Sequence, residues 1–217
     1  MTVYDAVMFN ENAPLFESIA NDIYSKGVSI NTCALPSNMT ALLVQYIKDL
    51  PAQSFQRAGV GRGKNHIINE VIRTDDIAWI TDDNVACSTW LNWTSSLQSY
   101  LNKHLYLGLC LFESHFAYYK KGDYYKKHKD AFKGEGNRVL SIVIYLNKNW
   151  ADEDGGELVI YNQNTPSPQD LHENKTLVSP TMGTIVVFLS EEFPHEVLTA
   201  KKDRYSIAGW FRGSRQI

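Results

Sequence analysis

The second half of the chain consists of short apolar and aromatic runs separated by turn-forming residues. Side chains of a β-strand point alternately to the two faces of its sheet, and runs of this length between glycine, proline and acidic residues predict strands. The predicted strands cover residues 110–119, 124–128, 139–146, 157–161, 184–189, 195–198 and 204–211. Short strands joined by frequent turns are typical of an antiparallel sandwich or barrel.

The first half of the chain shows helical spacing, with apolar residues recurring three and four positions apart. This spacing predicts helices over residues 14–25, 37–50 and 84–104, and short strands are predicted over residues 28–34, 68–72 and 77–80. Ser37 is a candidate N-cap, and Asp82-Asp83-Asn84 is a good helix start. The pattern as a whole predicts a mainly β protein with supporting N-terminal helices (α+β).

Composition excludes several classes of protein. The chain of 217 residues fits one domain, and its formal charge of -3 argues against nucleic acid as the main partner. The first residues show no basic segment followed by an apolar core, and no apolar run reaches the length of a membrane span. We therefore expect a cytoplasmic protein without a membrane partner. The widely spaced Cys33, Cys87 and Cys110 are expected to be small core residues in a reducing compartment.

Candidate metal ligands stand on two of the predicted strands. His128 and Asp130 are two residues apart, so in an extended chain their side chains project from the same face. His195 follows the predicted strand over residues 184–189 and is the third candidate ligand. Two histidines and one carboxylate leave positions open on a metal ion, the arrangement found in non-haem Fe(II) oxygenases. The competing interpretation is a His/Asp spacing that arose by chance.

Arg204 is a candidate anion-binding residue, nine positions after His195 and at the start of a predicted strand. A guanidinium fork binds a carboxylate in bidentate fashion, which a lysine does less specifically. The alternative is a structural ion pair between Arg204 and Asp203 or Glu196.

A series of motifs extends from about residue 109 to residue 212. In order, they are Tyr119…Gly122…Tyr125…His128-Lys129-Asp130, Val143-Ile144-Tyr145-Leu146-Asn147, Gly155-Gly156, Pro194-His195, Arg204-Tyr205 and Trp210-Phe211. Together they resemble the iron- and 2-oxoglutarate-dependent dioxygenases, and within them the prolyl 4-hydroxylases. Residues 58–63 and 72–80 resemble the hairpin that precedes the core in bacterial relatives of the oxygen-sensing prolyl hydroxylases.

The resemblance implies a fold and a division of the chain. Residues 105–217 would form a double-stranded β-helix (jelly-roll) core. Residues 1–104 would give helical support, with a substrate-side hairpin at about residues 55–80, and the two parts would form one compact unit.

The resemblance also implies roles for individual residues. His128, Asp130 and His195 would hold Fe(II), while 2-oxoglutarate would be bound by Arg204, Tyr145 and Tyr119. The residues implied on the substrate side are Arg73, Asp75, Tyr125, Arg138 and Trp210. Taken without the resemblance, the aromatic residues among these are ordinary core or sheet-surface residues. No role is implied for His66, His115 and His172.

The implied reaction is hydroxylation of a prolyl residue in a protein, coupled to conversion of 2-oxoglutarate and dioxygen to succinate and carbon dioxide, with ascorbate as reductant. Elongation factor Tu is the candidate partner in the bacterial group. Ala208-Gly209 stands where many relatives carry a hydroxyl residue, so the pocket floor is expected to differ. Three alternatives stay open: an oxygenase of a free amino acid or small metabolite, a non-catalytic cupin-like barrel that binds metal or sugar, and a structural interaction domain.

Overall fold

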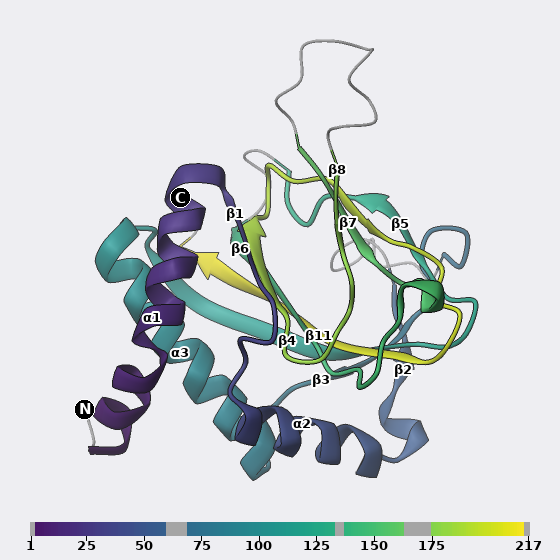
Figure 1. Cartoon of the computed structure of the whole chain (residues 1–217), viewed down its shortest axis with the longest axis horizontal. Coiled ribbons are helices and arrows are strands. Elements are labelled where there is room, and N and C mark those ends of the chain that lie inside the picture. Colours follow the sequence, from purple (N-terminus) through teal and green to yellow (C-terminus); the bar gives the residue numbers. More distant parts are fainter. Residues whose placement is uncertain (1–2, 60–68, 133–136, 163–174, 215–217) are drawn as a thin grey trace.

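The computed structural model describes residues 3–59, 69–132, 137–162 and 175–214, with side chains in the first helix from Asn12 onward. Within these residues the α-helices are α1 (Val3–Lys26), α2 (Ser37–Asp49) and α3 (Val85–Leu105). They lie together on one face of a large sheet, as the left and lower parts of Figure 1 show. In this part of the chain, no helix is both long and apolar enough to cross a membrane.

The described strands form two antiparallel sheets. The larger sheet has the order β1-β9-β6-β11-β4-β3-β2 and the smaller one the order β5-β10-β7-β8. Their bounds are β1 (Val28–Asn31), β2 (Gln56–Arg57), β3 (Asp76–Trp79), β4 (Leu109–Tyr119), β5 (Tyr125–His128), β6 (Arg138–Tyr145), β7 (Leu158–Tyr161), β8 (Lys175–Val178), β9 (Ile185–Leu189), β10 (His195–Val197) and β11 (Arg204–Gly213). Two 3₁₀ turns, Ala52–Ser54 and Asp152–Asp154, complete the described elements.

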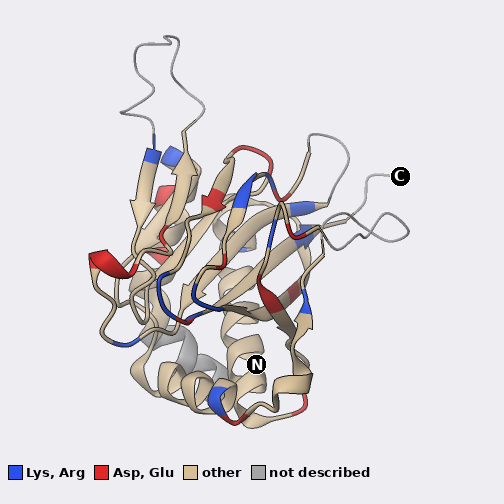
Figure 2. Ribbon diagram, turned by 90° about the vertical axis from the view of Figure 1, so that its right-hand side faces the viewer, with Lys and Arg blue, Asp and Glu red and all other residues tan. Residues whose placement is uncertain are grey.

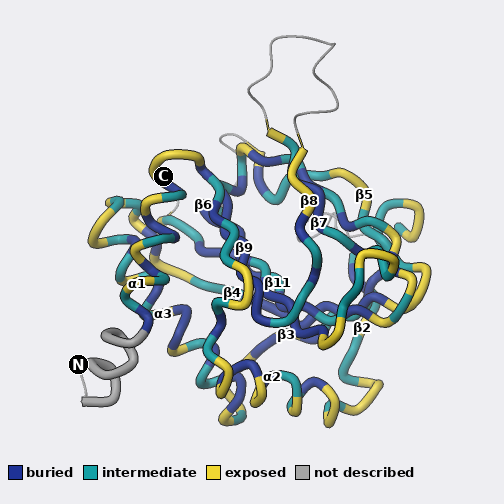
Figure 3. The backbone as a smooth tube through the Cα atoms, in the orientation of Figure 1, coloured by how far each residue is buried: buried dark blue, intermediate teal, exposed yellow. Residues whose placement is uncertain are grey.

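Two hydrophobic layers hold this arrangement together. One lies between the helices and the larger sheet, and the other lies between the two sheets. Strand β6 contributes to both because its side chains alternate: Leu140, Ile142 and Ile144 face the helices, while Tyr145 faces the smaller sheet. Figure 3 shows the resulting band of buried backbone through β4, β6, β9 and β11. The two facing sheets confirm the predicted jelly-roll core with supporting helices.

Several predicted boundaries need correction. Helix α1 begins at Val3 rather than residue 14. Ser37 is the first residue of α2 rather than its N-cap; the N-cap is Pro36, whose side chain makes no capping hydrogen bond. The strand predicted over residues 68–72 is wrong where the structure describes it. Residues 69–72 form a turn in which the Ile72 amide donates to the Asn69 carbonyl at 2.9 Å. Strand β8 was not predicted.

Other local predictions are partly confirmed and partly wrong. The helix start at Asn84 is confirmed, because its side chain accepts a hydrogen bond from the Cys87 amide at 2.9 Å. Cys87 is buried as predicted, but Cys33 and Cys110 are exposed, so the prediction of core positions is wrong for these two. Figure 2 shows acidic and basic residues interspersed along the ribbon.

Candidate active site

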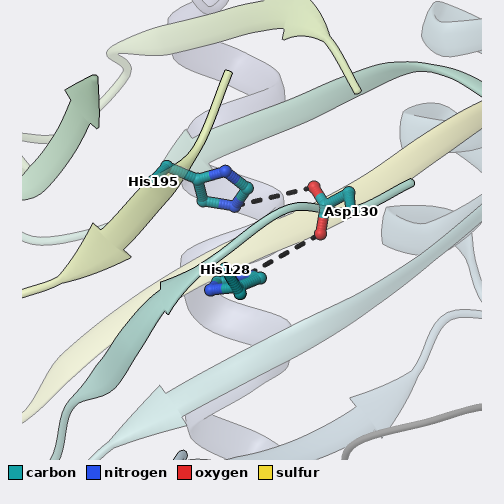
Figure 4. Close-up of side chains that lie close together, drawn as sticks. All are labelled: His128, Asp130 and His195. Carbon is teal, nitrogen blue, oxygen red and sulfur yellow. Dashed lines mark ion pairs between the residues drawn. The ribbon is translucent and has the colours of Figure 1, made fainter. Parts of the chain in front are cut away.

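The backbone register brings the three candidate metal ligands together. His128 ends β5 and is the register partner of His195, the first residue of β10. Asp130 follows two residues after β5, and its carboxylate oxygens lie 3.7 Å from His128 Nε2 and 3.6 Å from His195 Nε2. One ligand atom from each of the three residues lies within 4.8 Å of the others. Figure 4 shows both imidazoles directed at this carboxylate.

Backbone hydrogen bonds fix the two imidazoles in the orientation that a metal ion requires. The Nδ1 atom of His128 lies 2.8 Å from the Lys126 carbonyl, and Nδ1 of His195 lies 3.0 Å from the Phe193 carbonyl. When each Nδ1–H donates to its carbonyl, the lone pair of Nε2 is left for a metal. The donor set therefore fits a divalent iron ion with open coordination positions.

The electrostatics of the cluster also suit a cation. Burial, followed by the neighbouring His195, lowers the pKa of His128 to about 3, so the imidazole is neutral and able to coordinate. For Asp130, burial opposes ionisation, but His195, His128 and a hydrogen bond from Ser141 together hold its pKa below the ordinary value. The Ser141 hydroxyl donates to Asp130 Oδ2 at 2.6 Å.

Arg204 is buried at the start of β11, with 1% of its surface exposed. Its Nε donates to the Gly156 carbonyl at 2.9 Å and its Nη1 donates to the Ser206 hydroxyl at 3.1 Å. None of the salt bridges among the described residues involves Arg204. The alternative of a structural ion pair is therefore wrong for the described carboxylates. Since a buried charge without a partner is costly, this arginine indicates an anionic ligand.

Two tyrosines flank the Arg204 guanidinium. Its central carbon lies 4.8 Å from the ring centre of Tyr119 and 5.1 Å from that of Tyr145. The Tyr145 hydroxyl is buried and makes no hydrogen bond of good geometry with any described residue. Burial raises the pKa of Tyr145 to about 12, so its hydroxyl stays protonated and can donate to an anion.

The residues predicted on the substrate side form two contact groups. Arg73 makes a bidentate pair with Asp75, at 2.7 and 2.6 Å, and its guanidinium lies 4.4 Å from the ring centre of Tyr125. The guanidinium carbon of Arg138 lies 3.5 Å from the ring centre of Trp210. Asp75 is fully buried beneath Arg73, so it positions this arginine and is not itself exposed.

One cavity of about 340 Å³ connects these groups. It is lined by the three candidate metal ligands, by Arg204, and by all of the predicted substrate-side residues except Asp75. This volume is at the lower end of the range for small-molecule sites. The geometry places three candidate metal ligands, a buried guanidinium and apolar walls around a single cavity.

Sequence reasoning missed several residues that support the site. Ser141 is the clearest case, because it was a polar residue inside the apolar run over residues 139–146 and could have been singled out for that reason. Ser206, two positions after Arg204 on the same predicted strand, shares its face and could have been singled out in the same way. Nothing in the sequence indicated that the Gly156 carbonyl holds Arg204. His66 and His172 lie outside the described residues.

The family profile for the 2OG-Fe(II) oxygenase superfamily matches residues 114–212. A crystal structure of a prolyl-4-hydroxylase from Pseudomonas putida is 33% identical, with a TM-score of 0.81, and the match covers 92% of this chain and 100% of that one. A prolyl hydroxylase from Trichoplax adhaerens, solved in complex with a hypoxia inducible factor peptide fragment, is 26% identical with a TM-score of 0.78, covering 98% and 94%.

Among curated proteins, prolyl hydroxylase EGLN3 of Mus musculus is 31% identical over 166 residues, which is 71% of this chain and 62% of the mouse protein. The chain thus spans less than two thirds of this relative. The family match, the full coverage of the Pseudomonas structure and the His-Asp-His cluster agree. The chain belongs to the 2OG-Fe(II) oxygenase superfamily, whose members use iron, 2-oxoglutarate and dioxygen.

Proposed function

We propose that this chain is a dioxygenase that hydroxylates a prolyl residue of a protein, with succinate and carbon dioxide as co-products. One observation carries the proposal: the His128, Asp130 and His195 cluster shares a cavity with a buried Arg204 that has no carboxylate partner among the described residues. 2-Oxoglutarate has a keto-acid end that can bind a metal and a distal carboxylate that can pair with this arginine.

The residues of the chain would act by binding and placement. His128, Asp130 and His195 would hold Fe(II), which supplies the activation of dioxygen and the oxidation of the substrate when bound. Arg204 and the Tyr145 hydroxyl would donate hydrogen bonds to the distal carboxylate of 2-oxoglutarate, and Tyr119 would cover the other side of the guanidinium. The surrounding apolar strands would keep water from this part of the cavity.

The protein-substrate part of the proposal is supported by the relatives. The Pseudomonas structure is described as a prolyl-4-hydroxylase, and the Trichoplax enzyme was solved with a peptide bound. Arg73, Tyr125, Arg138 and Trp210 would contact the substrate, with Asp75 holding Arg73. Elongation factor Tu is the candidate partner, on the resemblance to bacterial prolyl hydroxylases, and ascorbate is the expected reductant.

The test measures succinate formed from 2-oxoglutarate with Fe(II) and ascorbate, with and without purified elongation factor Tu. Wild type should form more succinate with the protein, and a proline-containing peptide of that protein should gain one oxygen atom in mass. His128→Ala should be inactive. Arg204→Lys should raise the Kd for 2-oxoglutarate by about tenfold or more, because a lysine replaces the fork with a point charge.

The matched control is His104→Ala, because His104 lies near the end of α3, where its ring stacks on Tyr100 at 4.0 Å. This variant should keep wild-type activity. Equal succinate formation by wild type and His128→Ala would refute the proposal that His128 helps to hold the metal. Succinate formation that responds to a free amino acid and to no protein would refute the protein substrate alone.

A further inference from the structure

His115 lies in the wall of the same cavity, and the proposed function gives it no role. It stands in the middle of β4 with 2% of its surface exposed. Neither of its ring nitrogens has a hydrogen-bond partner among the described residues. Buried polar groups in folded proteins are almost always paired, so an imidazole that lines a cavity with both nitrogens unpaired indicates a ligand group that pairs with it.

The register of the larger sheet places His115 next to the proposed reaction site. Its partner on β11 is Ala208, which in turn is opposite Val143 on β6. This row lies between the row of Ser141, which holds the metal-binding carboxylate, and the row of Tyr145 beside Arg204. Ala208 lines the same cavity as His115. His115 thus lies between the row that holds Asp130 and the row beside Arg204, and the proposed function uses it for neither the metal nor 2-oxoglutarate.

Two tryptophans flank the imidazole. Its ring centre lies 5.2 Å from that of Trp79 and 5.4 Å from that of Trp210. Trp79 is 57% exposed, and Phe132, which lines the same cavity, is 62% exposed. Exposed aromatic rings at a cavity mouth offer flat apolar contacts for a ring or a peptide plane. A ligand that packs on Trp79 would lie beside the buried imidazole.

The charge state of His115 limits what it can recognise. Burial, followed by the positive charges of Arg73 and Arg138, lowers its pKa to about 3. The neutral ring has one N–H donor and one acceptor nitrogen, so it suits an uncharged polar group better than a carboxylate. Near a target proline the main chain offers carbonyl oxygens but no N–H on the proline itself. A carbonyl oxygen is thus the expected partner of the imidazole N–H.

We propose that His115 is a specificity-determining residue, which donates a hydrogen bond from its imidazole to a main-chain carbonyl oxygen of the substrate beside the target residue. The inference rests on the proposed function, because it requires a peptide substrate in this cavity. His115 would contact the peptide and not 2-oxoglutarate. Loss of the imidazole should therefore weaken peptide binding and leave 2-oxoglutarate binding unchanged.

The experiment uses two substitutions, His115→Leu and His115→Gln, of which glutamine restores a donor and an acceptor. The probe is the peptide that wild type hydroxylates fastest in a synthetic library of acetylated, amidated, proline-centred peptides. Binding of this peptide and of 2-oxoglutarate is measured by anaerobic titration with Fe(II) present, and kcat and KM are measured separately. Analogues of the same peptide carry a methylene group in place of one main-chain carbonyl at a time.

His115→Leu should raise the Kd and KM for the peptide about tenfold, as for one lost hydrogen bond in a buried site, and His115→Gln should recover most of this loss. The 2-oxoglutarate Kd should stay at the wild-type value in both variants. One methylene analogue should bind wild type about tenfold more weakly than the parent peptide does. The same analogue and the parent peptide should bind His115→Leu equally well, because the hydrogen bond between the imidazole and the carbonyl is already absent there.

Three results would overturn the inference. The first is wild-type peptide affinity in His115→Leu, and the second is an equal loss of 2-oxoglutarate affinity in both variants, which would place the imidazole in the co-substrate site. With either result the proposed function stands, since wild type still hydroxylates the peptide. The third is a wild-type protein that converts 2-oxoglutarate but hydroxylates no library peptide, which overturns the protein substrate together with the role of His115.

Discussion

The ring of Tyr125 stacks on the imidazole of His128, with the ring centres 3.6 Å apart and the planes inclined by 14°. Arg73, which is paired with Asp75, lies over the same tyrosine ring. This series of contacts connects the turn before β3 to a candidate metal ligand on β5. The His128 ring, oriented by its hydrogen bond to the Lys126 carbonyl, thus also packs on a tyrosine that contacts a buried ion pair from a distant part of the sequence.

Replacing Asp75 by asparagine should destabilise the protein strongly. Asp75 is fully buried, and the substitution leaves the mostly buried Arg73 without its bidentate carboxylate partner. Breaking one side of a buried pair typically costs about 3–5 kcal/mol. Urea denaturation of metal-free protein measures this loss, and Fe(II) titration should show weaker binding because the ring that packs on His128 is released.

The control for this prediction is the surface pair Lys26–Asp22, with N···O at 2.8 Å and 66% of the lysine side chain exposed. Lys26→Gln should cost less than about 1 kcal/mol, since water screens an exposed pair. Equal effects of Asp75→Asn and Lys26→Gln would contradict the proposed importance of the buried pair.

Ser141→Ala should weaken metal binding without removing a ligand. The serine hydroxyl donates to Asp130 Oδ2 and also contacts the Ser190 hydroxyl at 2.9 Å. Loss of a hydrogen bond to a coordinating carboxylate typically lowers metal affinity about 10–100-fold. Anaerobic calorimetry with Fe(II) measures the change. Ser190→Ala, one contact further from Asp130, should have a smaller effect, and the opposite order would contradict this account.

Gly156→Ala should impair 2-oxoglutarate binding through Arg204. Gly156 has a φ of +70°, and a Cβ there would lie 3.0 Å from Arg204 Cδ and 3.3 Å from Ala200 Cβ. The substitution should raise the Kd for 2-oxoglutarate about tenfold, as expected when one charge-assisted hydrogen bond is lost, and should also lower stability. Isothermal titration with 2-oxoglutarate and thermal unfolding measure the two effects.

Gly122→Ala is the matched control. Gly122 also has a positive φ, +97°, but a Cβ there would meet no heavy atom within 4 Å. It should lose about 1–3 kcal/mol of stability from backbone strain alone and keep its affinity for 2-oxoglutarate. If both variants lost affinity equally, the contact between Gly156 and Arg204 would not be the cause.

The neutral, buried His115 predicts a pH dependence of stability. Its pKa is lowered to about 3, first by burial, whereas an unfolded histidine titrates near the ordinary value of 6.5. Between these values the unfolded chain holds the extra proton, so stability falls as the pH falls below the unfolded pKa. From pH 7 to pH 5 this single group should remove about 2 kcal/mol.

His115→Leu isolates this contribution, because the other titrating groups are common to both proteins. The free energy of unfolding of wild type should decrease more than that of the variant between these two pH values. Parallel curves for wild type and His115→Leu would show that the imidazole is not held neutral.

Some residues of the candidate site could be predicted from the sequence and others could not. The spacing of His128 and Asp130, and the positions of His195 and Arg204 at strand starts, pointed to the metal cluster and to an anion-binding arginine because alternation along a strand is a local property. Part of their support was not visible, since Ser141 reaches Asp130 from β6 and the Gly156 carbonyl reaches Arg204 from the segment before β7. No role could be assigned to His115 from the sequence, because its unpaired nitrogens appear only once its neighbours are known.

The sequence by itself determined the class of the fold, the three helical regions, the main strands of the core and the residue types of the candidate metal site. These follow from periodicity, turn residues and side-chain chemistry, each of which acts over a few positions. Only the tertiary structure decided that His128 and His195 are register partners, that residues 69–72 form a turn, and that Cys33 and Cys110 are exposed. Register, burial and pairing depend on contacts between distant segments, and no local pattern records them.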